Sequence, residues 1–415
     1  MNMGIIFITI LAFITRIFSL FLLGRHITPE VWEYDTIALN IIQQKGYSFN
    51  HLNATYHSYV YPVYPFLTAL SHLITGRNYF ALEIFQIILS AAACYFIYLI
   101  AKLIFNQKVG LLSSFLVALH PGLIVYSTKL HELTLVVLFL TVIFWLIASL
   151  DYSKVYNNIF IGILIGIGVL TRPTFVFFLP VYFLYIWLHS KRFKYALKAI
   201  AAVTLFLILI ILPWTIRNYQ IHKRWIFITT NSAEHFWRGN NPAASGSALT
   251  EDGYSIIEKA PSEFKEKIYK MTEIEQYDFF YKEAYRFIGS NPVFFIKLVL
   301  RKFFYFCWFS PQVGLMYPGL WKIVYRAYYG ILFFTFILGL YASLFKEKLG
   351  INRAAVVSMS FFLFLTLLLH TVYYVEIRHR WAIEPFMLIF SAFGLTGLWR
   401  KIALNDSREN LSRPV

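Results

Sequence analysis

Residues 5–23 read IIFITILAFITRIFSLFLL, and this stretch decides the fold class because it is apolar over a length that crosses a bilayer. About 20 apolar residues in a helix span the hydrocarbon core of a membrane. Backbone amides in lipid must be satisfied within the protein, and the chain lacks the alternating pattern of a β-barrel, so the segment is predicted to be a helix. Similar runs follow along the chain, which predicts an all-α polytopic membrane protein.

The composition supports this class. Of the 415 residues, 59% are hydrophobic and 14% are charged, and the mean hydropathy is +0.60, outside the usual range of soluble domains. The formal charge of +16 is explained by membrane anchoring and anionic lipids, so no nucleic-acid partner is expected. The two cysteines, Cys94 and Cys307, are too few for a disulfide framework.

Apolar runs along the chain predict about ten transmembrane helices. We expect them at 5–24, 80–104, 110–128, 133–150, 158–171, 174–189, 197–215, 325–345, 354–373 and 381–399. The first is interpreted as a retained signal anchor because it lacks a basic leader and a small-residue cleavage site.

Charge in the short loops predicts the orientation. The segments 106–108, 190–194, 346–353 and 399–413 are rich in Lys and Arg, which places them and both termini in the cytoplasm. Two long segments, 25–79 and 216–324, then lie outside.

We therefore divide the chain into three parts. They are an N-terminal membrane module (1–215) with a catalytic first outer loop (25–79), an outer region with interfacial helices (216–324), and the C-terminal helices with a cytoplasmic tail (325–415). Within the outer region, 291–309 carries Lys297, Arg301 and Lys302 along one side. We interpret this segment as an interfacial amphipathic helix, with a membrane span as the alternative.

The first outer loop collects three acids in ITPEVWEYDTIALNIIQQKGYSF (27–49). Thr28 as N-cap and Pro29 at the first helical position predict a helix that runs to Gly46. On that helix Glu33 and Asp35 point about 200° apart, so only some of the acids can address one substrate. A structural reading also stands, because acids in a first helical turn complement the helix dipole.

The same loop begins a series of motifs that resembles a known family. Residues 29–47 fit PE-x-x-x-Y-x-x-x-A-x-N-x-x-x-x-x-GY, and further blocks follow in the family's order. These are YPVYPFLTAL (61–70), HPGLIVYSTKLHELTL (120–135), GVLTRPTFVFFLP (168–180), LPWTIRNY (212–219), TTNSAEHFWRGNNPAASG (229–246) and VEIRHRWAIEP (375–385). Together they resemble the C-type membrane glycosyltransferases that use polyprenyl-phosphate sugars. Within that class they are similar to protein O-mannosyltransferases and lipid A aminoarabinose transferases.

The resemblance implies inverting transfer of a sugar from a polyprenyl-phosphate donor to an acceptor hydroxyl or phosphate on a protein, lipid or glycan. The family's leading acid corresponds to Glu30, although that acid is usually Asp, and Val60 stands where the family often has Arg. The implied setting is the outer face of a bacterial inner membrane. The identity of the acceptor is left open.

Such a transfer needs a base for the acceptor hydroxyl and cations for the departing phosphate. Glu30 or Asp35 is expected to be the base. The expected phosphate partners are Arg217, Arg378, Arg380, Arg172 and Lys129, and the expected pocket residues are Tyr34, Glu33, His131, Glu132 and Trp237.

Structural alternatives exist for several of these residues. Arg172 and Arg217 could snorkel to the interface, and Arg378 and Arg380 could pair with nearby glutamates. Glu132 could serve a neighbouring cation, and Trp237 could pack within an ordered loop.

The histidines show no HxxxH or HExxH spacing, so no metal ligand is assigned. The wider class leaves use of a divalent cation open. Two other functions remain as alternatives: a transporter or flippase for a lipid-linked or anionic solute, and a surface-polysaccharide polymerase or ligase. Clustered outer-loop acids and the lack of two related halves favour the transferase over the transporter.

Overall fold

The fold is known from a computed structural model that describes residues 2–311, 319–345 and 350–411. Within these residues the chain is largely helical, and its only strands form one short antiparallel hairpin, β1 (Phe49–His51) and β2 (Ala54–Tyr56). The predicted all-α fold is therefore confirmed. The predicted basic segments 346–353 and 399–413 lie partly outside the described residues.

The membrane bundle contains most of the long helices. Among the residues that the structure describes, six segments are long and apolar enough to cross a bilayer: Met3–Leu22, Tyr79–Ile104, Pro173–Ser190, Phe193–His222, Lys322–Phe345 and Arg353–Val372. They belong to helices α1 (Met3–Leu22), α4 (Tyr79–Ile104), η1 (Pro173–Phe177) with α9 (Phe178–Ser190), α10 (Phe193–His222), α15 (Gly319–Phe345) and α16 (Arg353–Val372). The shorter apolar helices include α5 (Gln107–Ala118), α7 (Leu133–Ser149) and α8 (Val155–Val169), and α18 (Glu384–Leu411) covers the last predicted span. The predicted number of about ten is not confirmed by these criteria.

One predicted span is broken. The run 110–128 forms two helices, α5 and the short α6 (Pro121–Tyr126), with a break at His120. Pro121 occupies the first turn of α6, and the His120 side chain accepts a hydrogen bond from Leu123 N at 3.1 Å. The proline ring thus ends one helix and starts the next, as proline does when it stands at a helix N-terminus.

Arg16 satisfies the end of α5 from within the first span. Its guanidinium donates to Ala118 O at 3.0 Å and Val117 O at 3.4 Å, and its Nε donates to Ser90 Oγ at 2.7 Å. The side chain is fully buried. A charged residue in a span is thus placed against the last carbonyls of a helix that stops inside the bundle.

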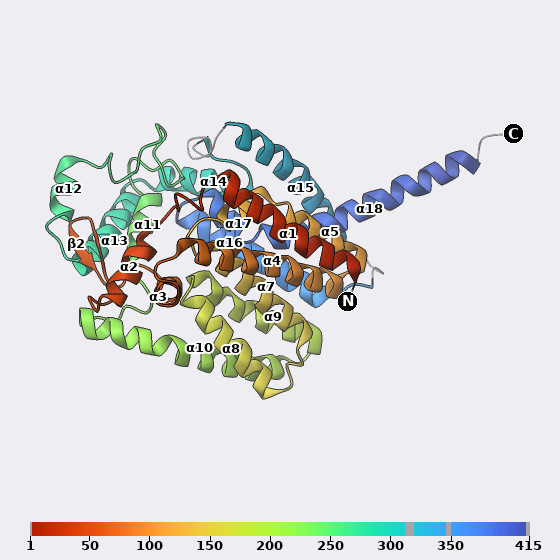
Figure 1. The fold of residues 1–415 in the computed structure, drawn as a ribbon, viewed down its shortest axis with the longest axis horizontal. Coiled ribbons are helices and arrows are strands. Elements are labelled where there is room, and N and C mark those ends of the chain that lie inside the picture. The colour runs from red at the N-terminus through yellow and green to blue at the C-terminus, as the bar shows by residue number, and fades with distance from the viewer. Residues whose placement is uncertain (1, 312–318, 346–349, 412–415) are drawn as a thin grey trace.

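The remaining elements gather at one end of the bundle, the left end in Figure 1, away from the N-terminus. We call this the cavity end. Its elements are α2 (Glu33–Ile42), the hairpin, α3 (Val63–Thr75), α11 (Asn231–Gly239), α12 (Ser262–Ile268), α13 (Glu273–Ser290), α14 (Pro292–Cys307) and α17 (Ile377–Trp381). A small separate core of α11, α12 and α13 side chains, including Phe236, Trp237 and Phe280, forms here.

The structure corrects the start of the helix that was predicted to begin at Thr28 and Pro29. Thr28 does not cap a helix, because its hydroxyl donates back to Gly24 O at 3.2 Å. Helix α2 begins at Glu33 and ends at Ile42, so Glu30 precedes the helix. The predicted divergence of Glu33 from Asp35 is confirmed, since Glu33 lines a cavity while Asp35 packs against His72 of α3.

Helix α14 matches the predicted segment 291–309 and is not among the six long apolar segments. Its interfacial position stays a prediction. The expected stripe of three cations is wrong in one member: Lys297 is exposed, but Lys302 is fully buried and donates to Asn240 Oδ1 at 2.9 Å.

Candidate active site

A cavity of about 440 Å³ lies at the cavity end. Its walls come from α2, the hairpin and the segment after it, the turn before α7, the turn before η1, α11, and the α16 to α17 connection. It is lined by Trp32, Glu33, Tyr34, Phe49, His51, Tyr59, Val60, Tyr61, His131, Glu132, Arg172, Pro173, Thr174, Asn231, Ser232, His235, Arg238, Leu369, His370, Tyr373, Tyr374, Arg378 and His379. Charged, aromatic and imidazole groups from distant parts of the chain therefore face one volume.

The carboxylates of Glu33 and Glu132 both line the cavity, and they differ in their hydrogen-bond partners. Glu132 accepts a hydrogen bond from the Tyr34 hydroxyl and lies 3.2 Å from His131 Nδ1. Apart from a hydrogen bond with its own backbone, the Glu33 carboxylate has no hydrogen bond or ion pair among the residues that the structure describes. Burial, and then the charge of Glu132, raise the pKa of Glu33, although the bond to its own backbone and the charge of Arg378 oppose the shift. Glu33 is therefore the carboxylate whose proton affinity and freedom suit a base.

Three guanidinium groups line the same cavity. Arg378 pairs with Glu376 at 2.5 Å and lies over the ring of Trp32 at 5.3 Å. Arg238 pairs with Glu234. The side chain of Arg172, at the start of η1, has no hydrogen bond or ion pair within the described part of the chain. Arg172 thus keeps its full set of donors for an anionic ligand.

Glu234 joins α11 to the hairpin. Its carboxylate accepts from Arg238 Nε at 3.0 Å, from the Tyr59 hydroxyl at 2.7 Å, and lies 3.1 Å from His51 Nε2. The charge of Arg238 and the contacts with His51 keep the pKa of Glu234 below its ordinary value despite burial. This ion pair holds Arg238 at the cavity wall.

His131 and His235 are neutral groups in the cavity wall. Burial lowers the pKa of His131 to about 3 and that of His235 to about 3. His131 Nδ1 accepts from Leu133 N at 3.1 Å, which leaves its proton on Nε2. His370 and His379 stack with ring centroids 4.3 Å apart. These rings supply hydrogen-bonding and stacking surfaces, so positive charge at the cavity comes from arginines.

The structure places both predicted bases outside the cavity. Glu30 pairs with Arg25 and with Lys129, whose Nζ lies 2.8 Å from Glu30 Oε1. Burial alone would raise the pKa of Glu30, but the contacts with Lys129 and Arg25 lower it. Asp35 is buried between His72 at 2.7 Å and Arg77 at 2.9 Å. Both acids are thus neutralised by cations or imidazole.

The other predicted residues divide in the same way. Arg172, Arg378, Tyr34, Glu33, His131 and Glu132 line the cavity, whereas Lys129, Arg217, Arg380 and Trp237 do not. Arg217 lies over the Trp214 ring at 4.5 Å and donates to His57 O at 2.6 Å. Trp237 is buried in the small core of α11, α12 and α13, stacked on Phe264 at 4.8 Å, and it lies in helix α11 where a loop was expected.

Arg238, His51 and His235 are cavity residues that were not assigned to the site from the sequence. One signal was available for Arg238, which stands four residues after Glu234 in α11 and pairs with it. The two histidines carried no such signal, because their neighbours in the cavity come from other segments.

Metal binding was tested by the arrangement of ligands. Across the part of the chain that the structure describes, no group of three or more His, Cys, Asp or Glu side chains could hold a metal ion. The donor set that faces the cavity therefore gives no basis for placing a divalent cation.

Known proteins resemble this chain in sequence and in fold. Residues 57–216 match the family described as dolichyl-phosphate-mannose-protein mannosyltransferase. This region includes Arg172, His131 and Glu132. A curated relative, the undecaprenyl phosphate-alpha-4-amino-4-deoxy-L-arabinose arabinosyl transferase of Wigglesworthia glossinidia brevipalpis, is 27% identical over 193 residues. That match covers 45% of this chain and 34% of the relative, so the chain matches only about a third of that enzyme.

Solved structures share the fold over nearly the whole chain. An oligosaccharyltransferase from Archaeoglobus fulgidus, crystallised with zinc and sulfate, aligns with a TM-score of 0.58 at 14% identity and covers 97% of this chain and 50% of its own. The archaeal enzyme with an inhibitory peptide and a dolichol-phosphate aligns with a TM-score of 0.55 at 13% identity, over 99% of this chain and 52% of that one. The expected family resemblance is confirmed: the chain is similar to polyprenyl-phosphate-dependent glycosyltransferases in sequence and has the fold of the membrane oligosaccharyltransferases.

Proposed function

We propose that this protein transfers a sugar from a polyprenyl-phosphate donor to an acceptor hydroxyl, with inversion at the anomeric carbon. The observation that carries the proposal is that an unpaired carboxylate, Glu33, and an unpaired guanidinium, Arg172, face one cavity within the described structure. The matched family and relative, whose names specify polyprenyl-phosphate sugars, support the donor class.

The chemistry follows from these two groups. Glu33 takes the acceptor proton as the acceptor oxygen bonds to the anomeric carbon. The bond from that carbon to the phosphate oxygen breaks, and the polyprenyl phosphate leaves with the electron pair. Arg172 and Arg378 stabilise the charge that develops on the phosphate, because a guanidinium presents paired donors to phosphate oxygens and stays charged near lipid.

The rest of the cavity suits a sugar. Tyr59, Tyr61 and Tyr374 add phenol rings to the wall, and Trp32 is held by Arg378 on one face. Phenol and imidazole groups can pack on the apolar faces of a sugar ring and bond its hydroxyls. Burial raises the pKa of Tyr374 to about 12, so its hydroxyl remains a donor at neutral pH.

We propose the extracytoplasmic side of a bacterial inner membrane as the location of the cavity. The basic segments 106–108 and 190–194 join α4 to α5 and α9 to α10. These connections lie at the opposite ends of their helices from the segments that line the cavity, which supports this orientation under the positive-inside rule.

The test uses the purified full chain in nanodiscs with a panel of radiolabelled polyprenyl-phosphate monosaccharides and a crude extract of envelope acceptors. We expect label to move from the lipid to an acceptor with one donor class. Glu33→Gln should abolish transfer while it retains donor binding, and Arg172→Gln should weaken donor binding. Glu283→Gln, which alters an exposed pair with Arg286, is the matched control.

The proposal fails if wild-type protein transfers none of the labelled sugars although it is folded and binds the lipids. Movement of an intact labelled lipid between leaflets of the same membranes, without sugar transfer, would instead support the transporter alternative. Transfer of a preassembled oligosaccharide in place of a monosaccharide would support the polymerase or ligase alternative.

A further inference from the structure

We propose that Glu384 is a positioning residue that fixes two walls of the cavity relative to each other: the first is the helix carrying Arg378, and the second is the segment ending at Glu132. The inference rests on the proposed function for its kinetic consequence, but its structural consequence can be measured without a donor. Glu384 lies outside the cavity and touches neither the donor nor the acceptor in this proposal.

The first wall is attached through Arg380. This side chain is 2% exposed, and its Nε donates to Glu384 Oε1 at 2.6 Å. Its Nη1 donates to Phe306 O at 2.9 Å and to Trp308 O, at the end of α14, and its Nη2 donates to the Tyr325 hydroxyl at 3.1 Å. Arg380 thus fastens α17 to α14 and α18.

Arg378 and Arg380 stand two residues apart on the five-residue helix α17. At about 100° per residue they point in nearly opposite directions. Arg378 reaches the cavity while Arg380 reaches the buried network. Fixing Arg380 therefore fixes the direction of Arg378.

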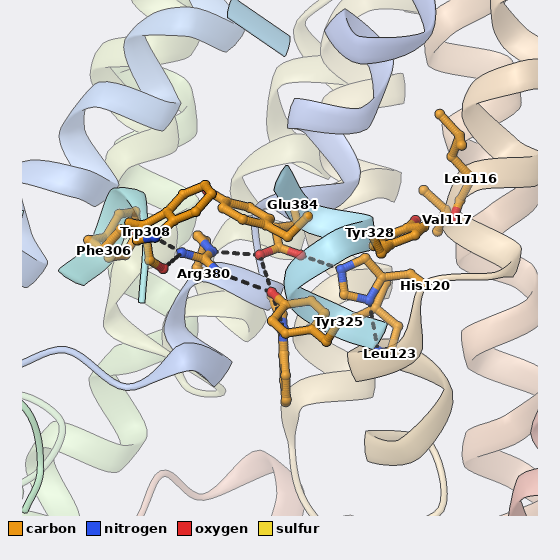
Figure 2. A network of polar contacts seen from close by, with 12 residues as sticks. Leu116, Val117, His120, Leu123, Phe306, Trp308, Tyr325, Tyr328, Arg380 and Glu384 are labelled. Atoms are coloured by element: carbon orange, nitrogen blue, oxygen red, sulfur yellow. Dashed lines mark hydrogen bonds and ion pairs between the residues drawn. The ribbon is translucent and has the colours of Figure 1, made fainter. Parts of the chain in front are cut away.

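The second wall is attached through His120. Its Nε2 contacts the other oxygen of Glu384, and its Nδ1 accepts from Leu123 N at 3.1 Å, which caps α6. Helix α6 leads directly into the turn that carries His131 and Glu132. Figure 2 shows Glu384 between Arg380 on one side and His120 on the other.

Two further contacts make this connection rigid. The Tyr325 hydroxyl donates to Glu384 Oε1 at 2.7 Å and accepts from Trp381 Nε1 at 2.7 Å. A Cβ on Gly122 would lie 2.3 Å from the Trp381 ring, so α6 and α17 approach as closely as glycine permits. One carboxylate at 2% exposure therefore joins both walls, and loss of its charge should loosen both.

The structural test is hydrogen exchange of the full chain in nanodiscs without donor. Glu384→Gln should speed exchange of peptides covering both 119–132 and 374–383 by about tenfold or more, because local opening becomes easier where a buried network is broken. His120→Asn keeps a side chain able to cap α6 and removes the contact with Glu384, so it should reproduce the effect if Glu384→Gln does not fold. Faster exchange in only one of the two peptides would overturn the proposal.

The kinetic test uses the donor identified above. Glu384→Gln should lower kcat/KM for the donor by about 10–100-fold, the usual effect of losing a residue that orients a site. If Glu384 acts through Arg378, the same change in an Arg378→Gln background should have a much smaller effect. Additive losses would refute the positioning role. Absence of transfer by wild type with changed exchange in both peptides would reject the proposed function and retain the structural link.

Discussion

Lys129 Nζ lies 2.8 Å from Glu30 Oε1, and this ion pair holds the first acid of the segment 25–79 away from the cavity. Arg25 contacts the other oxygen of the same carboxylate. A carboxylate held by two cations is a weaker base than a free one, because both charges favour its ionised form. Glu33, three residues later, faces the cavity without such a partner among the described residues.

Glu33→Gln should therefore abolish sugar transfer, since the amide cannot take the acceptor proton. The expected loss in kcat is about 100–10,000-fold, the usual contribution of a positioned base. Donor binding, measured by retention of labelled lipid, should change little. Single-turnover transfer in nanodiscs separates the two effects.

Glu30→Gln is the matched substitution three residues away. It should lower the unfolding temperature, because Lys129 at 12% side-chain exposure loses its charged partner, and it should reduce kcat far less than Glu33→Gln. If Glu30→Gln alone abolishes transfer with donor binding intact, the base is Glu30, as the sequence predicted.

The pH profile distinguishes the same two acids independently. A base must be deprotonated, so activity is lost as the pH falls through its pKa. Burial raises the pKa of Glu33 above the ordinary value of 4.5, whereas Lys129 and Arg25 lower that of Glu30 despite burial. The acid limb of kcat/KM should therefore lie above pH 4.5. A limb below that value in folded enzyme would favour Glu30.

Arg172→Gln should raise the donor KM by about 10–100-fold, because hydrogen bonds from a charged donor contribute roughly 1.5–3 kcal/mol each. Arg172→Lys should recover part of the binding, since it restores charge without the planar fork. The measurement is titration of labelled polyprenyl phosphate without sugar. Equal binding by all three proteins would show that another group holds the phosphate.

Much of the fold could be predicted because long runs of apolar residues indicate membrane helices. The break at His120 could not be predicted in this way. A hydropathy window averages over the residues on both sides of the break, and only the position of Pro121 indicates it. The start of α2 was also missed. Thr28 followed by Pro29 has the chemistry of a helix start, yet the Thr28 hydroxyl bonds backward to Gly24 O, which no local pattern indicates.

The candidate site was only partly predictable for a related reason. Arg172, Arg378 and Glu132, which the motifs contain, line the cavity. They do not reveal which charges neutralise one another, because the partners come from distant segments: Lys129 lies 99 positions from Glu30. A motif therefore identifies the neighbourhood of a site, and ion pairing decides which of its members are free.

The crossing of α15 and α18 provides a test of the packing. A Cβ on Gly339 would lie 1.9 Å from Phe390 O, so the two helices meet backbone to backbone. Gly339→Ala should destabilise the protein by about 1–3 kcal/mol, as overpacking does in a tight contact. Gly397→Ala in α18, where nothing lies within 4 Å, is the control and should leave the unfolding temperature unchanged or raised. Equal unfolding temperatures for both variants would contradict this crossing.

Glu234 offers a test of how the hairpin and α11 are held together at the cavity. Its side chain is 2% exposed and contacts Arg238, Tyr59 and His51. Removing one partner of a buried ion pair typically costs about 3–5 kcal/mol. Because Arg238 is 23% exposed and water screens it in part, we expect Glu234→Ala to cost about 2–3 kcal/mol.

We expect Glu234→Ala to open the structure around the hairpin and α11 more readily than it unfolds the whole protein. The hairpin and α11 should separate, so limited proteolysis should cut Glu234→Ala within 49–56 faster than wild type. Glu234→Gln keeps one acceptor oxygen, for either Tyr59 or Arg238, and should show a smaller increase. Protease resistance equal to wild type in Glu234→Ala would mean that Glu273, which accepts from His57 N at 2.7 Å and Ser58 N at 3.0 Å, suffices to hold this loop.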